Sequence, residues 1–488
     1  MSTTRVPTRR DLRQISPWVW EVSASFRDDM RAPARLYADE DILAQALSDR
    51  SLEQLVNTAT LPGIVGYAMA MPDVHQGYGF PIGGVAATSV SDGVVSPGGV
   101  GYDINCGVRL LSTGLPAHDV APFIGELMSA LFREVPVGVG SSGEVRVDRQ
   151  ELRQVLAEGA GWAVRKGMGL AADLEHTEDH GCLAGADPSK VSPRALERGL
   201  DQVGTLGSGN HFLEIDEITE VYDEAAAVAL GLRQGDLCVW IHCGSRGLGH
   251  QVCSDYVRAL QPAVSHYKIT IPDRELVCAP VESPEGRDYL AAMACAANYA
   301  WANRQVITHF VRRVFERVLR GRLGEPALAM VYDVCHNIAK IEMHSVEGRP
   351  ARVCVHRKGA TRAFGPGRAE VPEAYRQLGQ PVLIPGSMGT GSYVLLGTER
   401  AMAETFGSAC HGAGRTMSRH GATRSISGRE LRLDLERSGI AVRAHSDKGL
   451  AEEAPQAYKD VDAVVEVVHQ HGMARRVART RPLGVMKG

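Results

Sequence analysis

A carboxylate and a thiol lie three positions apart in a segment bounded by glycines, Gly101-Tyr-Asp-Ile-Asn-Cys-Gly107. In so tight a loop Asp103 and Cys106 can face one ion, and a thiolate can also bridge two ions. One Cys, one Asp and three His suit Mn²⁺, Fe²⁺, Co²⁺ or Zn²⁺, whereas Mg²⁺ and Ca²⁺ prefer more oxygen ligands. Each residue alone is more often structural, but together they predict a transition-metal site. The three histidines, all beside small residues, are His211, His242 and His336.

Two glycine-rich segments have the composition of phosphate-binding loops. Pro385-Gly-Ser-Met-Gly-Thr-Gly-Ser392 offers backbone N–H groups and the hydroxyls of Ser387 and Ser392, although a plain turn has a similar composition. In Cys410-His-Gly-Ala-Gly-Arg415, a neutral imidazole is available near pH 7. His411 is therefore a candidate nucleophile toward a phosphate, whose charge Arg415 and a metal ion would neutralise; the alternative is a structural histidine.

Two stretches are basic and contain no acidic residue. Six Lys and Arg residues lie between Arg349 and Arg368, and four Arg residues lie between His411 and Arg429. Because Gly, Pro and Ser separate them, we expect loops rather than helix faces. Two basic loops near a phosphate-binding turn predict a path for a polyanion, and a solvated surface is the alternative.

The composition places these motifs in an ordinary globular protein. The 488 residues are 44% hydrophobic and carry a net charge of −4, so a nucleic-acid surface would have to be a local patch. Ten scattered cysteines without a disulfide framework fit a reducing cytoplasm. The polar N-terminus lacks the apolar core of a signal peptide, and no stretch resembles a bilayer span. We expect a soluble, cytoplasmic protein without membrane functions.

Short β-like runs and a few amphipathic helices must position the motifs. Their order shows no steady alternation of strand and helix, so we expect an α+β fold: one large mixed domain with a loop-rich, Gly-rich active-site cleft. The charge-mixed stretch Glu430–Arg443 is expected to be a surface excursion. Helices are predicted at Glu151–Lys166, Arg287–Arg320, Leu450–Ala454 and Asp460–His469, and strands at Val94–Val95, Val108–Ser112, Leu237–His242, Ala329–Asp333, Val353–His356 and Val382–Ile384.

In combination, nine segments resemble the RtcB family of RNA ligases, in the family's order and over residues 71 to 488. The resemblance predicts a catalytic domain at residues 71–488, with residues 1–70 as an N-terminal segment packed on it. The segments are Met71-Pro-Asp-Val-His-Gln-Gly-Tyr-Gly-Phe-Pro-Ile-Gly83, Gly101–Arg109, Gly207–Glu214, His242–His250, His336–Lys340, His356–Arg362, Pro385–Thr390, Cys410–Arg415 and Val485–Gly488.

The resemblance implies a GTP- and Mn²⁺-dependent reaction. It would join an RNA 3′-phosphate or 2′,3′-cyclic phosphate end to a 5′-hydroxyl end. The histidine at the place of His411 would take GMP as a phosphoramidate, GMP would pass to the RNA 3′-phosphate, and the 5′-hydroxyl would displace it. Two Mn²⁺ ions sharing the thiolate are implied at Asp103, Cys106, His211, His242 and His336.

Further roles also come from the resemblance. Residues at nucleotide-contacting places are Asn210, Phe212, Glu214, Ser387, Ser392, Gly412, Ala413, Gly414, Arg415 and Lys487. Residues at places that serve activity or RNA binding are Asp73, Arg246, Lys358 and Arg419. RNA is the expected partner and a monomer the expected state, while the need for an archease-type activator is left open. The alternatives are a metal-dependent phosphoesterase or nuclease acting on RNA, and an inactive RNA-binding scaffold.

Overall fold

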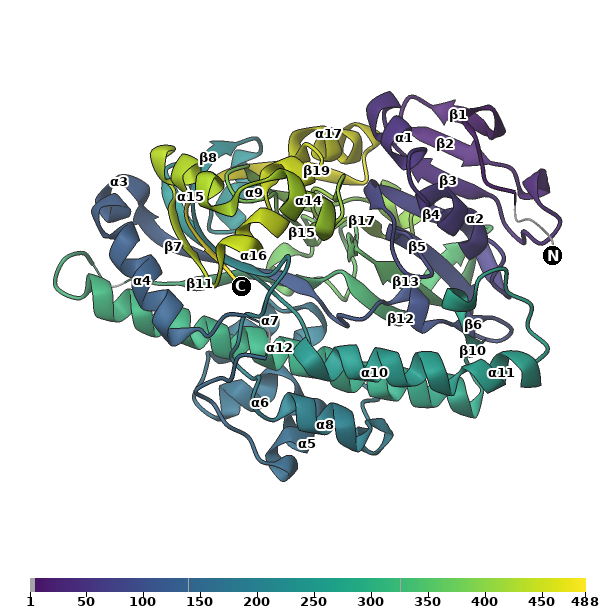
Figure 1. The fold of residues 1–488 in the computed structure, drawn as a ribbon, viewed down its shortest axis with the longest axis horizontal. Coiled ribbons are helices and arrows are strands. Elements are labelled where there is room, and N and C mark those ends of the chain that lie inside the picture. Colours follow the sequence, from purple (N-terminus) through teal and green to yellow (C-terminus); the bar gives the residue numbers. More distant parts are fainter. Residues whose placement is uncertain (1–4, 139, 325) are drawn as a thin grey trace.

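The computed structural model of the protein describes residues 5–138, 140–324 and 326–488 (Figure 1). Two β-sheets, one of seven and one of eight strands, form its centre. The mixed α+β class predicted from the sequence is confirmed. Within the described ranges, no helix is both long enough and apolar enough to cross a bilayer.

The seven-stranded sheet contains the N-terminal strands and has the order β1-β2-β3-β4-β5-β13-β12. Its neighbours pair antiparallel except β3 and β4, which are parallel. Residues before position 71 thus continue the same sheet as the later motifs. The strands are β1 (Leu12–Ser16), β2 (Val19–Val22), β3 (Ala34–Tyr37), β4 (Ile64–His75), β5 (Ile82–Ser89), β13 (Arg349–Lys358) and β12 (Asn337–Val346).

The eight-stranded sheet has the order β11-β7-β9-β8-β19-β16-β15, with β18 parallel to β19. Only His336 separates the end of β11 from the start of β12, so the two sheets meet at this residue. The strands are β11 (Ala329–Cys335), β7 (Gly107–Pro116), β9 (Asp236–Cys243), β8 (Phe212–Val221), β19 (Ala474–Lys487), β16 (Ser392–Gly397), β15 (Pro381–Ile384) and β18 (Ala441–Ala444).

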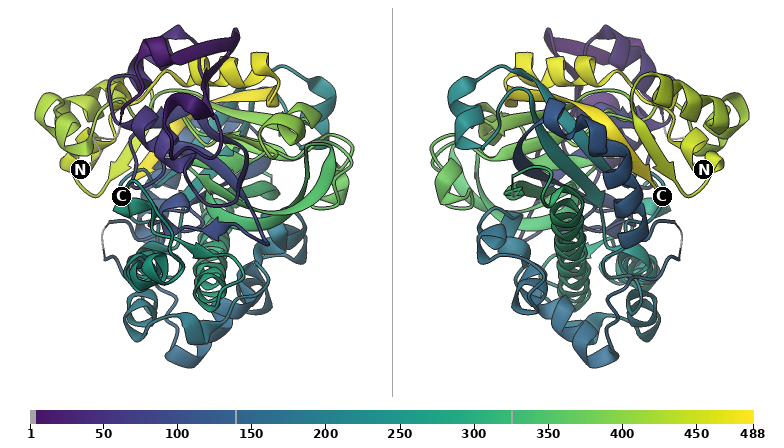
Figure 2. Two further views of the ribbon diagram at one scale, coloured as in Figure 1. Left: turned by 90° about the vertical axis from the view of Figure 1, so that its right-hand side faces the viewer. Right: turned by 90° about the vertical axis from the view of Figure 1, so that its left-hand side faces the viewer.

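A single long helix, α12 (Pro284–Leu319), supports the sheets from below and is seen end-on in Figure 2. Ser283 caps its first turn and Pro284 begins it, as is common at helix starts. Its alanine-rich middle is buried and packs closely against α4 (Ile124–Glu134), α5 (Arg149–Glu158), α6 (Ala160–Arg165) and α10 (Arg246–Ala259). The buried polar side chains of α12 are Asn298, Asn303, Arg304, Gln305 and Thr308.

The helix expected at Glu151–Lys166 is interrupted. Gly159 has a φ of 58° and separates α5 from α6. A Cβ atom at this position would lie 2.0 Å from Gly181 O, so only glycine lets the two segments approach this closely. The periodicity predicts one helix, but the close contact of Gly159 with Gly181, which is distant in sequence, divides it into two.

The prediction of a basic loop from Arg349 to Arg368 is wrong. Its first ten residues form β13, and two of its arginines are buried in ion pairs. Arg357 Nη1 lies 2.6 Å from Glu342 Oε1, and Arg362 Nε lies 3.3 Å from Glu178 Oε1. These guanidinium groups are neutralised inside the protein and offer no path to a polyanion.

The second basic run is not a loop throughout either, because it contains α14 (Arg419–Ser425) and the start of α15 (Gly428–Arg437). The stretch Glu430–Arg443 is also more than a surface excursion. Leu431 and Leu435 are buried in a small core cluster, and β18 pairs with β19.

Candidate active site

The five candidate metal ligands lie at one edge of the eight-stranded sheet. Asp103 and Cys106 precede β7, His211 precedes β8, His242 is near the end of β9, and His336 follows β11. Because β9 and β11 run antiparallel to β7, and β8 antiparallel to β9, these strand starts and ends coincide. Sheet register therefore brings together residues that are far apart in the sequence.

The ligand atoms form two groups that share one thiol. Cys106, His242 and His336 make one group and Asp103, Cys106 and His211 the other, with all donor atoms of a group within 4.8 Å of one another. Cys106 Sγ lies 3.2 Å from His242 Nε2 and 3.4 Å from His211 Nε2. A donor set of one thiol, one carboxylate and three imidazoles around a shared sulfur fits two transition-metal ions.

The protonation states of these groups depend on burial. Burial, reinforced by neighbouring cationic groups, holds the pKa of His242 and of His336 well below the usual value, so both imidazoles are neutral and each has a lone pair that a metal ion could take. Burial also raises the pKa of Cys106 to about 12, with a further contribution from Asp103. Binding a divalent ion at this sulfur must therefore displace a proton.

His211 is held by its other ring nitrogen. Its Nδ1 lies 3.0 Å from Leu206 O, while Nε2 lies 2.8 Å from Asp103 Oδ2. Burial opposes protonation, but the Cys243, Cys106 and Asp103 side chains outweigh it and raise the pKa of His211 well above its usual value. A metal ion bound to both His211 Nε2 and Asp103 Oδ2 would take the place of the proton between them.

Arg304 of α12 links the segments that carry the ligands. Its Nε and Nη2 each donate to Asp333 at 2.8 Å, and its Nη1 donates to Asn105 O at 2.9 Å and to Cys243 O at 2.8 Å. The guanidinium is fully buried. One side chain thus fixes the loop before β7, the end of β9 and the end of β11.

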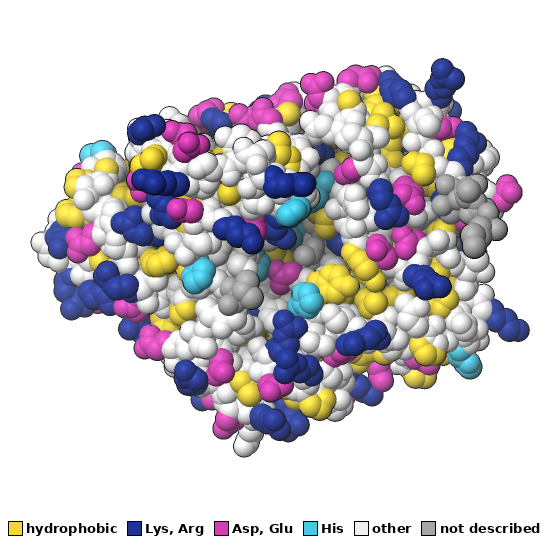
Figure 3. All heavy atoms as spheres, viewed as in Figure 1, with side chains coloured by type: hydrophobic (Ala, Val, Ile, Leu, Met, Phe, Trp, Pro, Cys, Tyr) yellow, Lys and Arg dark blue, Asp and Glu magenta, His cyan; other side chains and the backbone are white. Residues whose placement is uncertain are grey.

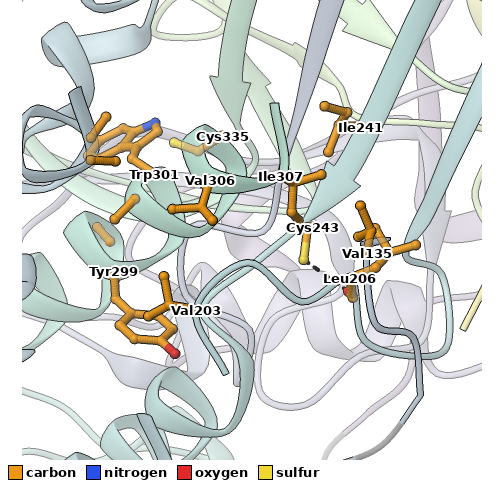
Figure 4. Packing of buried hydrophobic residues seen from close by; sticks show 14 of the residues in the cluster. Val135, Val203, Leu206, Ile241, Cys243, Tyr299, Trp301, Val306, Ile307 and Cys335 are labelled. Atoms are coloured by element: carbon orange, nitrogen blue, oxygen red, sulfur yellow. Dashed lines mark hydrogen bonds between the residues drawn. The ribbon is translucent and has the colours of Figure 1, made fainter. Parts of the chain in front are cut away.

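Asn303, the preceding residue, fixes the loop that leads to His211. Its Oδ1 accepts from Gly204 N at 2.7 Å and from Thr205 N at 3.1 Å. Cys243 packs beside it among apolar side chains and donates to Leu206 O (Figure 4). The metal-ligand loops therefore rest on a well-packed part of the core. Labelled neighbours in this view include Val135, Ile241, Tyr299, Trp301 and Ile307.

His411 lies directly beside these ligands, with its ring centroid 4.7 Å from that of His336. Its Nδ1 lies 2.6 Å from Asp73 Oδ2, and the same oxygen accepts from His411 N at 2.9 Å and Gly412 N at 3.3 Å. Asp73 is fully buried at the end of β4. Because Asp73 holds Nδ1, Nε2 is the ring nitrogen that can act as a nucleophile.

A cavity of about 630 Å³ opens in front of His411. It is lined by residues from both sheets and from the loop after β17 (Ser408–Cys410), and it reaches His242 and His336. The face shown in Figure 3 is hollowed near its centre, with Lys, Arg and His side chains around the hollow. Predicted nucleotide residues in the cavity wall are Asn210, Phe212, Glu214, Ser387, Gly412, Ala413, Gly414, Arg415 and Lys487.

The cavity wall includes the buried side chains of one glutamate and one lysine. Lys487 Nζ lies 5.3 Å from the Phe212 ring centroid and donates to Gly209 O and Asn210 O. Burial raises the pKa of Glu214 well above its usual value and lowers that of Lys487. Such groups can donate or accept hydrogen bonds at the edge of a bound base.

Besides Asp73 and the candidate ligands Asp103, Cys106 and His211, three predicted residues do not line the cavity. Ser392 accepts from Gly386 N within its own turn. Arg246 donates to Thr205 Oγ1 and Gly138 O. Lys358 is buried and donates to backbone carbonyls of two loops, those of Tyr78 and Gly98.

Several residues of the site gave no signal in the sequence. Glu453 is buried and binds two predicted site arginines, with Oε2 3.1 Å from Arg415 Nη1 and Oε1 2.8 Å from Arg419 Nε. Lys459 donates to the carbonyls on either side of Asp73, those of residues 72 and 74. No motif or spacing marks these two residues, and Arg304 lies in a helix that reads as ordinary core.

Comparisons with known proteins agree in pointing to one family. The family model described as "tRNA-splicing ligase RtcB" matches residues 54–488. A "tRNA-splicing ligase RtcB" of Archaeoglobus fulgidus is 56% identical over 98% of this chain and 99% of its own length, and the protein of the same name from Thermococcus kodakarensis gives the same values. An "RNA-splicing ligase RtcB" of Mycobacterium tuberculosis is 56% identical over 89% of this chain and 100% of its own length.

Proposed function

Because the chain belongs to the RtcB family of tRNA-splicing ligases, we propose that it joins RNA 3′-phosphate or 2′,3′-cyclic phosphate ends to 5′-hydroxyl ends, using GTP and two Mn²⁺ ions. The protein is an RNA ligase of this family. RNA is its partner in the proposal, and the reaction takes place in the cytoplasm on a monomer, without a membrane.

The observation that carries the proposal is the position of His411. Its Nδ1 is bound to Asp73, and its ring lies beside His336, which belongs to one of the two groups sharing Cys106. A hydrolytic metal site needs no further histidine held in this way, nor a cavity of about 630 Å³ lined by a buried Glu214 and Lys487. These features favour nucleotide transfer over a phosphoesterase or nuclease.

In the proposed sequence, His411 Nε2 attacks the α-phosphorus of GTP, an N–P bond forms, and pyrophosphate leaves. An oxygen of the RNA 3′-phosphate then displaces the histidine and takes GMP. The 5′-hydroxyl attacks the same RNA phosphorus, and GMP leaves as the phosphodiester forms. Mn²⁺, when bound, polarises phosphoryl oxygens and lowers the pKa of attacking groups.

The residues of the chain orient these steps. Asp73 holds the reactive tautomer of His411 and stabilises the positive charge that the ring gains when Nε2 bonds to phosphorus. Arg415 and Arg419, oriented by Glu453, face the phosphates. Asn210, Phe212, Glu214 and Lys487 bind the guanosine, and Ser387 with the Gly412–Gly414 backbone binds phosphate oxygens. Ser392 contributes by fixing its turn.

Arg246 and Lys358 then belong to the RNA side of the site. Residues 71–488 form the catalytic part, and residues 1–70 form a segment packed on it. The pairing of Met69 and Ala70 with β5, and the core cluster that Trp20 and Leu36 share with residues of β5 and β13, support this packing.

The test is the covalent intermediate. Purified protein with Mn²⁺ and α-labelled GTP should carry acid-labile, alkali-stable label, His411→Ala should carry none, and His420→Ala, which removes an exposed histidine nearby, should label normally. Wild-type protein that takes no label, even with an archease-type activator added, but still cleaves RNA or phosphoesters would establish the phosphoesterase instead.

A further inference from the structure

Three aromatic rings form a ladder beside the metal ligands. The Tyr78 and Tyr102 rings meet edge to face with centroids 5.3 Å apart, and Tyr102 stacks on His250 at 4.9 Å with an interplanar angle of 29°. His250 is exposed and the two tyrosines are partly exposed. We call Tyr78, Tyr102 and His250 the aromatic ladder.

The ladder begins where the wall of the cavity ends. Gln76 and Gly77 line the cavity, and Tyr78 is the next residue. At the other side, Tyr102 directly precedes Asp103, whose side chain is 31% exposed. The ladder therefore extends the cavity outward past the metal-ligand loop.

Lys358 fixes both loops that carry the tyrosines. Its ammonium donates to the carbonyls of Tyr78, Phe80 and Gly98, and its stem packs on Gly101, beside Tyr102. The side chain thus holds the ladder in place without reaching the cavity itself.

Positive charge lies beside the outer end of the ladder. Arg198 binds Gln251 Oε1 at 3.1 Å, next to His250. Burial lowers the pKa of His250, with a contribution from Arg198, so the imidazole is neutral at pH 7 and stacks as an uncharged ring.

We propose that the aromatic ladder binds an unpaired RNA nucleobase next to the ends being joined, with Arg198 facing an adjacent phosphate. The inference rests on the proposed RNA ligase function and adds a site for the substrate's bases. Single-stranded RNA is bound by flat aromatic or imidazole rings combined with arginines, because every base offers a π-face and every nucleotide a negative charge. The base belongs to either the 5′-hydroxyl strand or the 3′-phosphate strand.

The test uses His250, which is exposed and can be changed without disturbing the core. The variants are His250→Ala and His250→Phe, with Tyr222→Ala as a matched control, because Tyr222 is an exposed ring stacked on Tyr393 elsewhere on the surface. Binding is measured without GTP, using short single-stranded RNAs that carry either a 5′-hydroxyl or a 3′-phosphate. Each RNA is also made with an abasic terminal nucleotide.

The expected loss of RNA affinity in His250→Ala is roughly 5- to 150-fold, the range for one base stack. His250→Phe should restore binding and Tyr222→Ala should not change it. The abasic RNA should bind more weakly to wild-type protein, but its affinity for His250→Ala should equal that of the intact RNA. The RNA that shows this dependence identifies the strand bound by the ladder.

Equal sensitivity to the abasic nucleotide in wild-type protein and in His250→Ala would overturn the inference. Labelling of His411 by GTP is measured in parallel and needs no RNA, so it should be unchanged in His250→Ala. If His411 is labelled normally but the His250-dependent effect of the base is missing, the ladder inference is wrong and the ligase proposal stands. If His411 is not labelled but RNA binding still depends on the base and on His250, the ligase proposal is wrong and the ladder remains an RNA-binding site.

Discussion

Replacing Asp73 by asparagine should slow GMP transfer to His411 without changing the geometry of the pair. Asp73 Oδ2 accepts three N–H groups, and two of them belong to the backbone of residues 411 and 412. Backbone N–H groups can only donate, so the amide oxygen must take the place of Oδ2. It then still accepts from His411 Nδ1, and the reactive tautomer is preserved.

The magnitude follows from the loss of charge alone. A hydrogen bond to a charged group contributes about 1–2 kcal/mol more than a neutral one. The rate of guanylylation should therefore fall by roughly 5- to 30-fold. The amide nitrogen replaces Asp73 Oδ1, which is buried without a hydrogen-bond partner and lies against Gly83. An unsatisfied N–H₂ there should lower the free energy of unfolding by about 1–3 kcal/mol.

The assay is single-turnover labelling with saturating GTP and Mn²⁺, together with denaturant unfolding. Asp39→Asn is the control, because Asp39 also accepts a backbone N–H, that of Ile42, but caps helix α1 (Glu40–Ala46) rather than binding His411. Labelling of Asp73→Asn at the wild-type rate would refute the role of the charge. A loss beyond about 10³-fold would refute the argument that the amide oxygen stays in place, because a reversed amide would protonate Nε2.

Three further results are expected. Arg304→Lys keeps the charge but has too few donors for all five hydrogen bonds, so denaturant unfolding should show a loss of about 3–5 kcal/mol, with weaker Mn²⁺ binding by titration. Burial raises the pKa of Asp216 from 3.8 to about 7, so the folded protein keeps a proton that the unfolded chain loses, and stability falls as the pH rises from about 4 to about 7. Asp216→Asn should remove this fall. The variant should be more stable than wild type by up to about 4 kcal/mol at pH 8, with little difference at pH 4. Wild-type protein should bind two Mn²⁺ ions and gain about 2.7 kcal/mol per ion at a free concentration 100 times Kd, whereas Cys106→Ser should lose most of this gain in thermal unfolding.

The sequence was most informative where the chemistry is local to a strand end. Asp103 and Cys106 could be recognised from their loop, and His242 from the apolar strand that it ends, because alternation and glycine spacing are short-range signals. That these residues lie together depends on the register of β7, β8, β9 and β11, which the sequence does not state. The motif order of a family supplied this information.

The predictions that were wrong or missed depend on contacts between residues that are far apart in the sequence. The stretch around Arg357 and Arg362 looked like a polyanion path because the sequence does not show their distant partners, Glu342 and Glu178. The helix break at Gly159 depends in the same way on Gly181. Glu453 was missed because a carboxylate that orients arginines has no local signature.

The position of β19 in the second sheet also has a consequence for protein synthesis. This strand is translated after both β8 and β16, yet it lies between them, pairing Lys487 with Phe212 and Ala474 with Gly397. Until it emerges from the ribosome, both neighbours present open edges, which are prone to pair with other chains. The second sheet must therefore remain incomplete, and in need of protection from aggregation, until β19 has been made. Phe212 and Lys487 come together only at that point.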